Sequence, residues 1–105
     1  MISVTFFHDP DGRLLGYRFS GHSDYAEEGS DIVCAAVSSA AYLTANTLTE
    51  VLGLSPDLSV EDGHMEVRFP DAVPAAQASL KGLELHVQAL SGQYPDDIIC
   101  NFREV

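Results

Sequence analysis

The sequence predicts an α+β protein in which one mainly antiparallel sheet is covered by two helices. Three observations predict this fold. Five short segments alternate apolar and polar residues, as half-buried strands do, and two longer segments place apolar residues three and four apart, as amphipathic helices do. These segments follow one another in the order ββαββαβ. Because the strands and helices each have one apolar face, we expect the helices to cover the sheet in a two-layer sandwich.

Two hairpins are expected to supply four of the five strands. Alternation predicts strands over residues 2–6 and 15–19, and Asp9-Pro10-Asp11-Gly12 between them has the proline and glycine positions of a type I turn. The second hairpin is expected over residues 58–69. Its turn is predicted at Asp62-Gly63, because this dipeptide is among the strongest short-range hairpin signals.

The first helix is expected to begin at Asp31, with Ser30 as its N-cap, and to end before Gly53. The residues predicted on its buried face are Val37, Ala41, Thr44, Leu48 and Val51. The second helix is expected over residues 76–90, with Gly92 beyond its end. Each helix has one apolar face, so each is expected to pack against the sheet.

Length, composition and charge limit the possible functions. The chain has 105 residues, of which 46% are apolar, so we expect a single domain spanning residues 1–105. No uninterrupted run of eighteen apolar residues is present, as a membrane-spanning helix would require, and the first residues do not resemble a signal peptide; we therefore expect a cytoplasmic protein with reduced cysteines. The net charge of −11 argues against direct binding of nucleic acid or of an anionic membrane and favours a basic partner.

Most of the histidines and one of the cysteines are expected to be structural. No C-x-x-C, H-x-x-x-H or H-E-x-x-H spacing is present, so no metal site is predicted. His8, His64 and His86 are expected at the surface. Cys100 falls on the apolar phase of a last strand over residues 98–102, which predicts a buried free thiol in the core.

Cys34 and His22 are the candidates for catalysis. Cys34 falls in the first turn of the helix expected from Asp31, where free N–H groups favour negative charge, and the thiolate is the reactive form of cysteine. His22 lies at the head of a polar loop that returns to this helix, so the loop can bring imidazole and thiol together as a base and a nucleophile. The same N–H groups are expected to stabilise an oxyanion. The alternative is a cysteine packed under the sheet and a histidine in solvent.

Two motifs resemble the signature of a known protein family and support this interpretation. Gly21-His22-Ser23, followed by the ten-residue block Gly29-Ser30-Asp31-Ile32-Val33-Cys34-Ala35-Ala36-Val37-Ser38, is similar to the signature of the ribosomal-processing cysteine protease family called Prp. The resemblance extends over the whole chain in length and in element order. Ser23 departs from the small apolar residue expected there, but it leaves the His and Cys positions intact.

The resemblance implies an activity and assigns roles to residues. Members of this family remove a short N-terminal extension from large-subunit ribosomal protein twenty-seven. Carried over to this sequence, the signature implies Cys34 as nucleophile and His22 as general base, without metal or organic cofactor, in a homodimer. Gly21, Asp31 and Ser38 match further family positions.

Physical interpretations of these further positions stay open. Gly21 permits a backbone conformation closed to other residues. Asp31 either orients His22, as the third member of a triad does, or is a favourable charge at a helix terminus. Ser38 lies one turn after Cys34 on the same face, where it either hydrogen-bonds near the thiol or is a small residue packed against the loop.

Asp24, Glu27 and Glu28 give the loop after His22 an acidic character. A ribosomal protein is expected to be basic, so these carboxylates are expected to steer the substrate toward the thiol. The alternative is a solvated loop that is acidic for solubility.

Three other functions compete with proteolysis: a non-catalytic acidic binding module for a basic ribosomal protein, a thiol hydrolase such as a thioesterase, and a plain structural domain.

Overall fold

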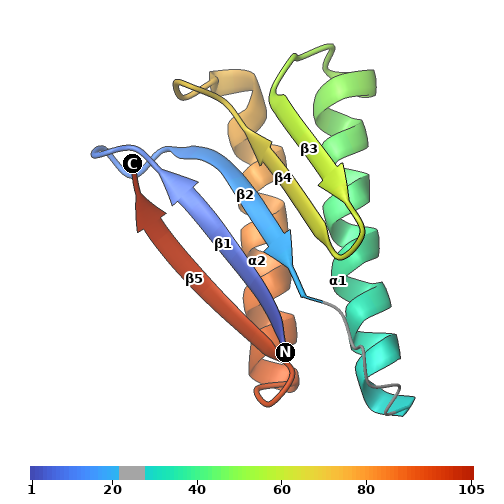
Figure 1. Ribbon diagram of the computed structural model, residues 1–105. Helices are drawn as coiled ribbons and strands as arrows, with labels where there is room; N and C mark the ends of the chain where they lie inside the picture. Colours follow the sequence, from blue (N-terminus) through green and yellow to red (C-terminus); the bar gives the residue numbers. More distant parts are fainter. Residues whose placement is uncertain (22–27) are drawn as a thin grey trace.

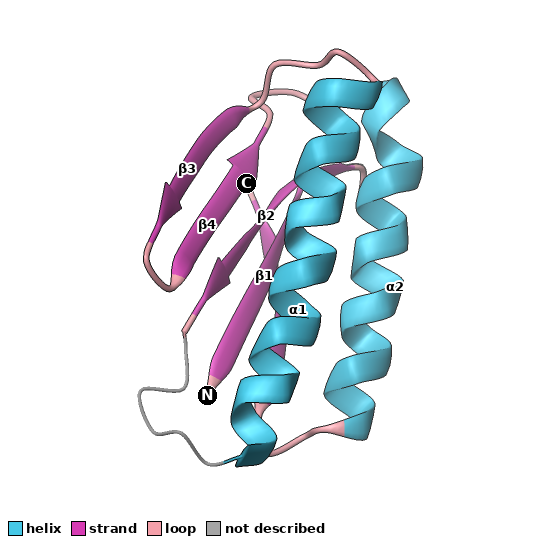
Figure 2. Cartoon of the chain, turned by 90° about the vertical axis from the view of Figure 1, so that its right-hand side faces the viewer, coloured by secondary structure: helices cyan, strands magenta, loops and turns pink. Residues whose placement is uncertain are grey.

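The computed structural model describes residues 1–21 and 28–105, and side chains within the first helix from residue 32 onward. Two helices pack side by side on one face of a five-stranded sheet (Figures 1 and 2). The helices and strands are β1 (Ile2–His8), β2 (Leu14–Ser20), α1 (Glu28–Asn46), β3 (Asp57–Glu61), β4 (His64–Arg68), α2 (Gln77–Gln93) and β5 (Ile98–Glu104). A π-helical turn, Thr47–Val51, extends α1, and a 3₁₀ turn, Pro74–Ala76, precedes α2.

The strands lie in the order β3-β4-β2-β1-β5. Only β1 and β5 are parallel, and the other three neighbouring pairs are antiparallel. The register aligns Phe6 with Tyr17 on one side and with Phe102 on the other, so apolar residues of neighbouring strands share the face beneath the helices. The predicted α+β sandwich with the order ββαββαβ is therefore confirmed.

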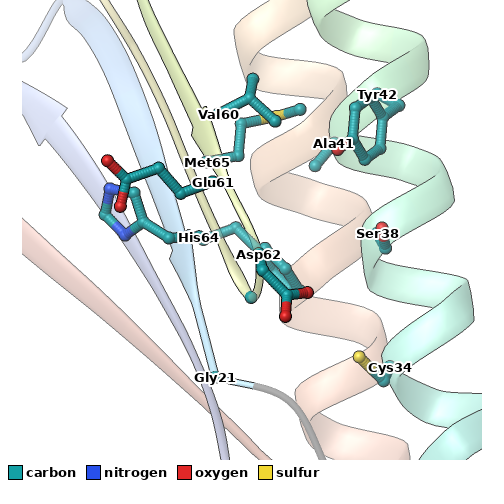
Figure 3. A pocket seen from close by; sticks show the side chains of 12 residues that line it. Gly21, Cys34, Ser38, Ala41, Tyr42, Val60, Glu61, Asp62, His64 and Met65 are labelled. Atoms are coloured by element: carbon teal, nitrogen blue, oxygen red, sulfur yellow. The ribbon is translucent and has the colours of Figure 1, made fainter.

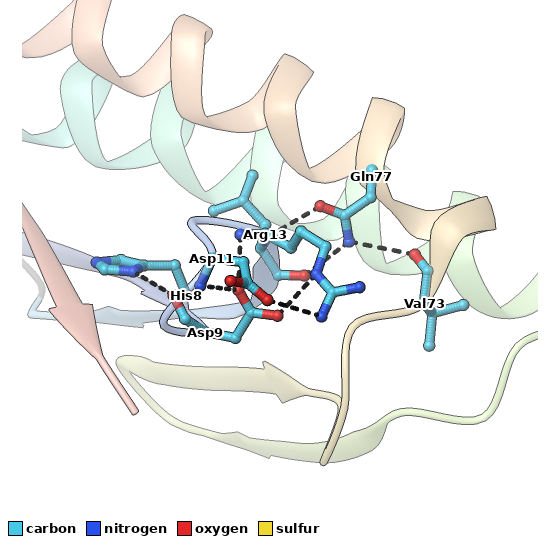
Figure 4. Close-up of polar contacts among 7 residues, drawn as sticks. His8, Asp9, Asp11, Arg13, Val73 and Gln77 are labelled. Atoms are coloured by element: carbon cyan, nitrogen blue, oxygen red, sulfur yellow. Dashed lines mark hydrogen bonds and ion pairs between the residues drawn. The ribbon is translucent and has the colours of Figure 1, made fainter.

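The turn between β1 and β2 is held by one carboxylate (Figure 4). The backbone N–H of Gly12 donates to the carbonyl of Asp9 at 3.0 Å, as the predicted turn requires. The Asp9 side chain accepts hydrogen bonds from the backbone N–H groups of Asp11 and Arg13 and from the Arg13 guanidinium at 2.9 Å. The turn is thus closed by its own side chains.

The Gln77 side chain joins the start of α2 to the sheet (Figure 4). Its amide nitrogen donates to the carbonyls of Leu14 and Val73, and its amide oxygen accepts from the backbone N–H of Leu14 at 2.9 Å. The β1–β2 hairpin and α2 therefore keep a fixed relative position at this end of the molecule.

Tyr17 connects the centre of the sheet to α1. Its ring is fully buried, and its hydroxyl donates a 2.7 Å hydrogen bond to the carbonyl of Ala41. The face of α1 that packs around this contact carries Val33, Val37, Ala41, Ala45 and Leu48. The position of α1 over the sheet is therefore set by apolar burial and by one buried polar contact.

The first helix differs from the prediction at both ends. It begins at Glu28 rather than Asp31, so Ser30 lies within the helix and is not its N-cap. Near its other end, the π-helical turn shifts the phase of the residues that follow, because such a turn holds more residues than an α-helical one. Leu48 is buried as predicted, but Val51 is 76% exposed. Gly53, with φ +66°, follows the end of this helical segment.

Residues Ile32–Val51 are long and apolar enough to cross a membrane by length and composition alone, with a mean hydropathy of 1.3. In this structure one face of that segment packs on the sheet. Core helices of folded domains commonly meet the same criterion, so the segment carries little evidence for a membrane span.

The last two elements also show small differences from the prediction. Helix α2 continues through Gly92 to Gln93, because glycine is tolerated inside a helix at a modest cost. Phe102 lies on the apolar phase of β5 but is 48% exposed, and its ring stacks on Phe6 with 6.0 Å between centroids. Neither change alters the topology.

We predict that Tyr17→Phe lowers the free energy of unfolding by about 1 kcal/mol near neutral pH, because a buried hydrogen bond is lost. Burial raises the pKa of Tyr17 above its ordinary value. The unfolded chain therefore releases this proton first, and stability falls as pH rises above about 10. Urea denaturation between pH 7 and 11 should show a smaller fall in the variant. Equal slopes for both proteins would contradict this role of the phenol.

Candidate active site

A groove of about 500 Å³ separates α1 from the β3–β4 hairpin (Figure 3). Its lining includes Cys34, Ser38 and Tyr42 from α1 and Val60, Asp62 and Met65 from the hairpin. Gly21, at the end of β2, lies at one end of the same groove.

The spacing along α1 places the thiol at the edge of the helix–sheet contact. Val33 and Val37 point into the core and are almost fully buried. Cys34 lies beside them, half-buried and not in a disulfide. Ser38 and Tyr42 follow at intervals of four residues, so these three groove-lining side chains share one face of α1. The thiol is therefore held by the core and open to the groove.

The upper part of the groove in Figure 3 is apolar. Tyr42 and Val60 face each other across it, each 47% exposed, and Met65 is buried behind Val60. Strand β3 is an edge strand, and each of its residues is exposed. The groove beside the end of β3 is therefore open to solvent.

His64 does not pair with Cys34, although both residues border the groove. The side chains of His64 and Glu61 point away from α1, whereas the carboxylate of Asp62 points toward the side where Cys34 lies (Figure 3). The alternation of strand side chains explains this, since Glu61 and His64 are partners across the hairpin and share the other face of the sheet.

Gly21 is fixed by its backbone. Its N–H donates to the carbonyl of Gly63 at 3.0 Å, which ties the residue before His22 to the tip of the β3–β4 hairpin. Its φ is +103°, and a Cβ at this position would lie 2.4 Å from the carbonyl oxygen of Met1. Glycine is therefore required here both by backbone conformation and by space.

Some predicted site residues lie outside what the structure describes. His22, Asp24 and Glu27 are in the segment 22–27, and the side chains of Glu28 and Asp31 are likewise not described. The pairing of Cys34 with His22 and the choice between the two roles of Asp31 therefore stay predictions. Of the predicted residues that are described, Gly21, Cys34 and Ser38 all line one groove.

The earlier start of α1 corrects one part of the predicted chemistry. Cys34 lies in the second turn of the helix and not in the first, because the helix begins at Glu28. The effect of a helix terminus on charge falls off within the first turn. The helix start is therefore a weaker source of thiolate stabilisation and of oxyanion donors than the sequence predicts.

Cys100 has a different environment. It lies on β5, at the edge of the sheet opposite the groove, where it is half-buried and packed against the core. Burial raises the pKa of the Cys100 thiol, and the nearby Glu84 carboxylate raises it further. Both effects disfavour the thiolate, so Cys100 has the surroundings of an unreactive thiol.

Sequence reasoning missed the side chains on the far wall of the groove. Val60, Asp62 and Met65 have the sequence pattern of an ordinary hairpin, and only the packing of that hairpin beside α1 reveals them as lining residues. The position of Tyr42 could be predicted from the sequence, because it lies eight residues after Cys34 on the same helix face. Among the side chains of residues 1–21 and 32–105, no group of three His, Cys, Asp or Glu is placed to hold a metal ion.

A free thiol in an open groove provides the nucleophile that a cysteine hydrolase requires. The comparisons with known proteins define the family. Residues 1–99 match the family model of the cysteine protease Prp. The chain therefore belongs to the cysteine protease Prp family.

Individual relatives agree with this assignment. The ribosomal processing cysteine protease Prp of Bacillus subtilis is 26% identical, over 93% of this chain and 94% of its own length. The crystal structure of the ribosomal processing protease Prp from S. aureus with a substrate peptide has a TM-score of 0.86 at 27% identity, covering 98% of this chain and 100% of that one. The same protease with a covalently linked product peptide has a TM-score of 0.81 at 28% identity and the same coverage.

We predict that Gly21→Ala destabilises the protein more than Gly53→Ala does. Both glycines have positive φ, so alanine is strained at each by about 1–2 kcal/mol. At Gly21 the new Cβ would also collide with the carbonyl oxygen of Met1. At Gly53 no atom lies within 4 Å of the new Cβ. Chemical denaturation of both variants measures the difference. Equal losses would show that the chain adjusts beside Met1 without cost.

Proposed function

We propose that this chain is an endopeptidase that removes the N-terminal extension of large-subunit ribosomal protein twenty-seven during ribosome maturation in the cytoplasm. The observation that carries the proposal is the position of Cys34, a free thiol in an open groove. Membership of the Prp family supports the activity, and the names of its relatives support the ribosomal substrate. The homodimer implied by the family resemblance is part of the same proposal.

The proposed reaction is covalent catalysis by Cys34 and His22. His22 takes the thiol proton, and the sulfur attacks the scissile carbonyl carbon to form a tetrahedral intermediate. When the C–N bond breaks, His22 gives its proton to the leaving amine, and a thioester remains on Cys34. Water, deprotonated by His22, then hydrolyses this thioester and regenerates the thiol. No metal or organic cofactor takes part in these steps.

Ser38 is the described side chain best placed to assist at the carbonyl. It lines the groove one helical turn from Cys34, and its hydroxyl has no hydrogen-bond partner among the residues that the structure describes. A free hydroxyl at this position can donate to the developing oxyanion or to the carbonyl that precedes the scissile bond. This role replaces the part that the sequence analysis assigned to N–H groups at the helix start.

The shape of the groove supports a peptide as substrate. Its apolar section between Tyr42 and Val60 can bury an apolar side chain, and its other section holds the thiol. The carboxylates of Asp24, Glu27 and Glu28 keep their proposed role of attracting a basic ribosomal protein, an effect that acts on association rate and weakens with salt.

We predict that Cys34→Ala abolishes cleavage of the extended ribosomal protein, whereas Cys100→Ala lowers stability and retains cleavage. The physical reason is that only Cys34 lies in the groove, whereas Cys100 packs against the core. Mass spectrometry of the product measures cleavage, and thermal unfolding measures stability. Full activity in the Cys34 variant would end the proposal. Hydrolysis of thioesters but not of peptides by the parent protein would instead make it a thioesterase.

We predict that His22→Gly lowers the cleavage rate by a factor of about 10²–10⁴, the usual contribution of a general base. Imidazole added to the solution should restore part of this rate, because it can replace the missing ring. The rate of alkylation of Cys34 by iodoacetamide at pH 7 should fall in the variant as well. Unchanged cleavage and unchanged alkylation would show that the imidazole does not activate the thiol.

A further inference from the structure

The carboxylate of Asp62 is the described charged side chain that points into the groove. It lies at the turn of the β3–β4 hairpin and is exposed, on the wall facing Cys34 and Ser38 (Figure 3). The neighbouring Glu61 borders the groove but points away from α1. The groove thus combines the thiol of Cys34 on one wall with the carboxylate of Asp62 on the other.

The chain's own cations do not neutralise this charge. The sequence has five basic residues: Arg13, Arg18, Arg68, Lys81 and Arg103. None of them is among the described residues that line the groove. Three already pair with other carboxylates, Arg13 with Asp9 and Asp11, Arg18 with Glu66, and Lys81 with Glu84. Arg68 lies over the ring of Phe7, with 4.4 Å between the guanidinium carbon and the ring centroid.

Asp62 also has no hydrogen-bond or ion-pair partner within the described part of the chain. Its carboxylate is therefore free to accept hydrogen bonds from a bound molecule. A Lys or Arg side chain satisfies both the charge and the hydrogen-bonding capacity of a carboxylate.

We propose that Asp62 is a specificity-determining residue that binds a Lys or Arg side chain of the substrate within this groove. This inference rests on the proposed peptidase function and assigns part of its selectivity to one residue. Steering by the acidic loop acts at a distance on any basic chain, whereas contact with Asp62 selects a cation at one position of the bound peptide.

The expected effect is moderate because the carboxylate is exposed. Exposed ion pairs are worth about 0.2–1 kcal/mol, which corresponds to at most about a fivefold change in affinity. We therefore expect Asp62→Asn to weaken binding of a peptide with the matching cation by about two- to fivefold. The hairpin should persist, because Asn-Gly is as favourable at a turn as Asp-Gly.

Glu61→Gln is the matched control. It removes the same charge from the adjacent residue of the same hairpin, but its side chain points away from the groove. A long-range effect of net charge would therefore appear in both variants, whereas direct contact would appear only in the Asp62 variant.

The experiment uses a peptide that spans the cleavage site of the ribosomal protein, together with copies in which each Lys or Arg in turn is replaced by Glu. Binding is measured by calorimetry on the Cys34→Ala protein, with Asp62 intact, replaced by Asn or replaced by Lys. Cleavage of the same peptides is measured with Cys34 present. Binding thus reports on Asp62 even if no peptide is cleaved, and failure of cleavage alone would count against the proposed peptidase function.

The inference predicts that one peptide position couples to Asp62. At that position the Glu copy should bind the Asp62 protein more weakly than the parent peptide does, and Asp62→Lys should reverse this preference. Coupling that is spread evenly over all positions, or equal losses in the Asp62 and Glu61 variants, would overturn the contact. Equal binding of all peptides to all variants would overturn it as well.

Discussion

Burial of one face of α1 against the centre of the sheet is the constraint on which the rest of the structure depends. Val33 and Val37 fill the contact near the thiol, and the hydrogen bond from Tyr17 to the carbonyl of Ala41 anchors the helix farther along. Cys34 is adjacent to these buried residues, so the same contact determines how far the thiol projects into solvent. A shift of α1 along the sheet would carry the thiol away from the hairpin, which links core packing directly to the chemistry of the groove.

The groove lies where α1 runs beside the β3–β4 edge of the sheet. Strand β3 lies at the edge, and each of its residues stays exposed, including Val60 on the helix side. An exposed apolar edge strand of this kind can pair with a strand of another chain and cause aggregation. Here it forms one wall of the site, opposite Tyr42. The hydrogen bond from the Gly21 N–H to the Gly63 carbonyl ties the end of β2 to this wall, so β2 and the tip of the hairpin are positioned relative to one another.

The sequence predicted the fold well because each element has a local signal of its own. Alternation gave the strands, helical spacing gave the helices, and the Pro-Asp-Gly and Asp-Gly segments gave the turns. The π-helical turn at Thr47–Val51 had no such signal, so Val51 was wrongly predicted to be buried. The start of α1 was predicted three residues too late. Ser30 is a favourable N-cap by residue type, but the helix begins at Glu28. Local rules find elements more reliably than they find the phase or the ends of a helix.

The site was only partly predictable for a different reason. Cys34 and Ser38 share a helix face, and that relation can be read from their spacing alone. Asp62 and Val60 reach the same groove through strand pairing and helix packing, which bring together residues more than twenty positions apart. A chain with a net charge of −11 has carboxylates over much of its surface, and composition cannot tell which of them faces a substrate. The structure distinguishes two neighbouring carboxylates, since that of Asp62, in the turn, points toward the side where Cys34 lies and that of Glu61, at the end of β3, points away (Figure 3). The overall charge can attract a basic protein to the molecule, but only a carboxylate in the groove can determine which part of that protein lies beside Cys34.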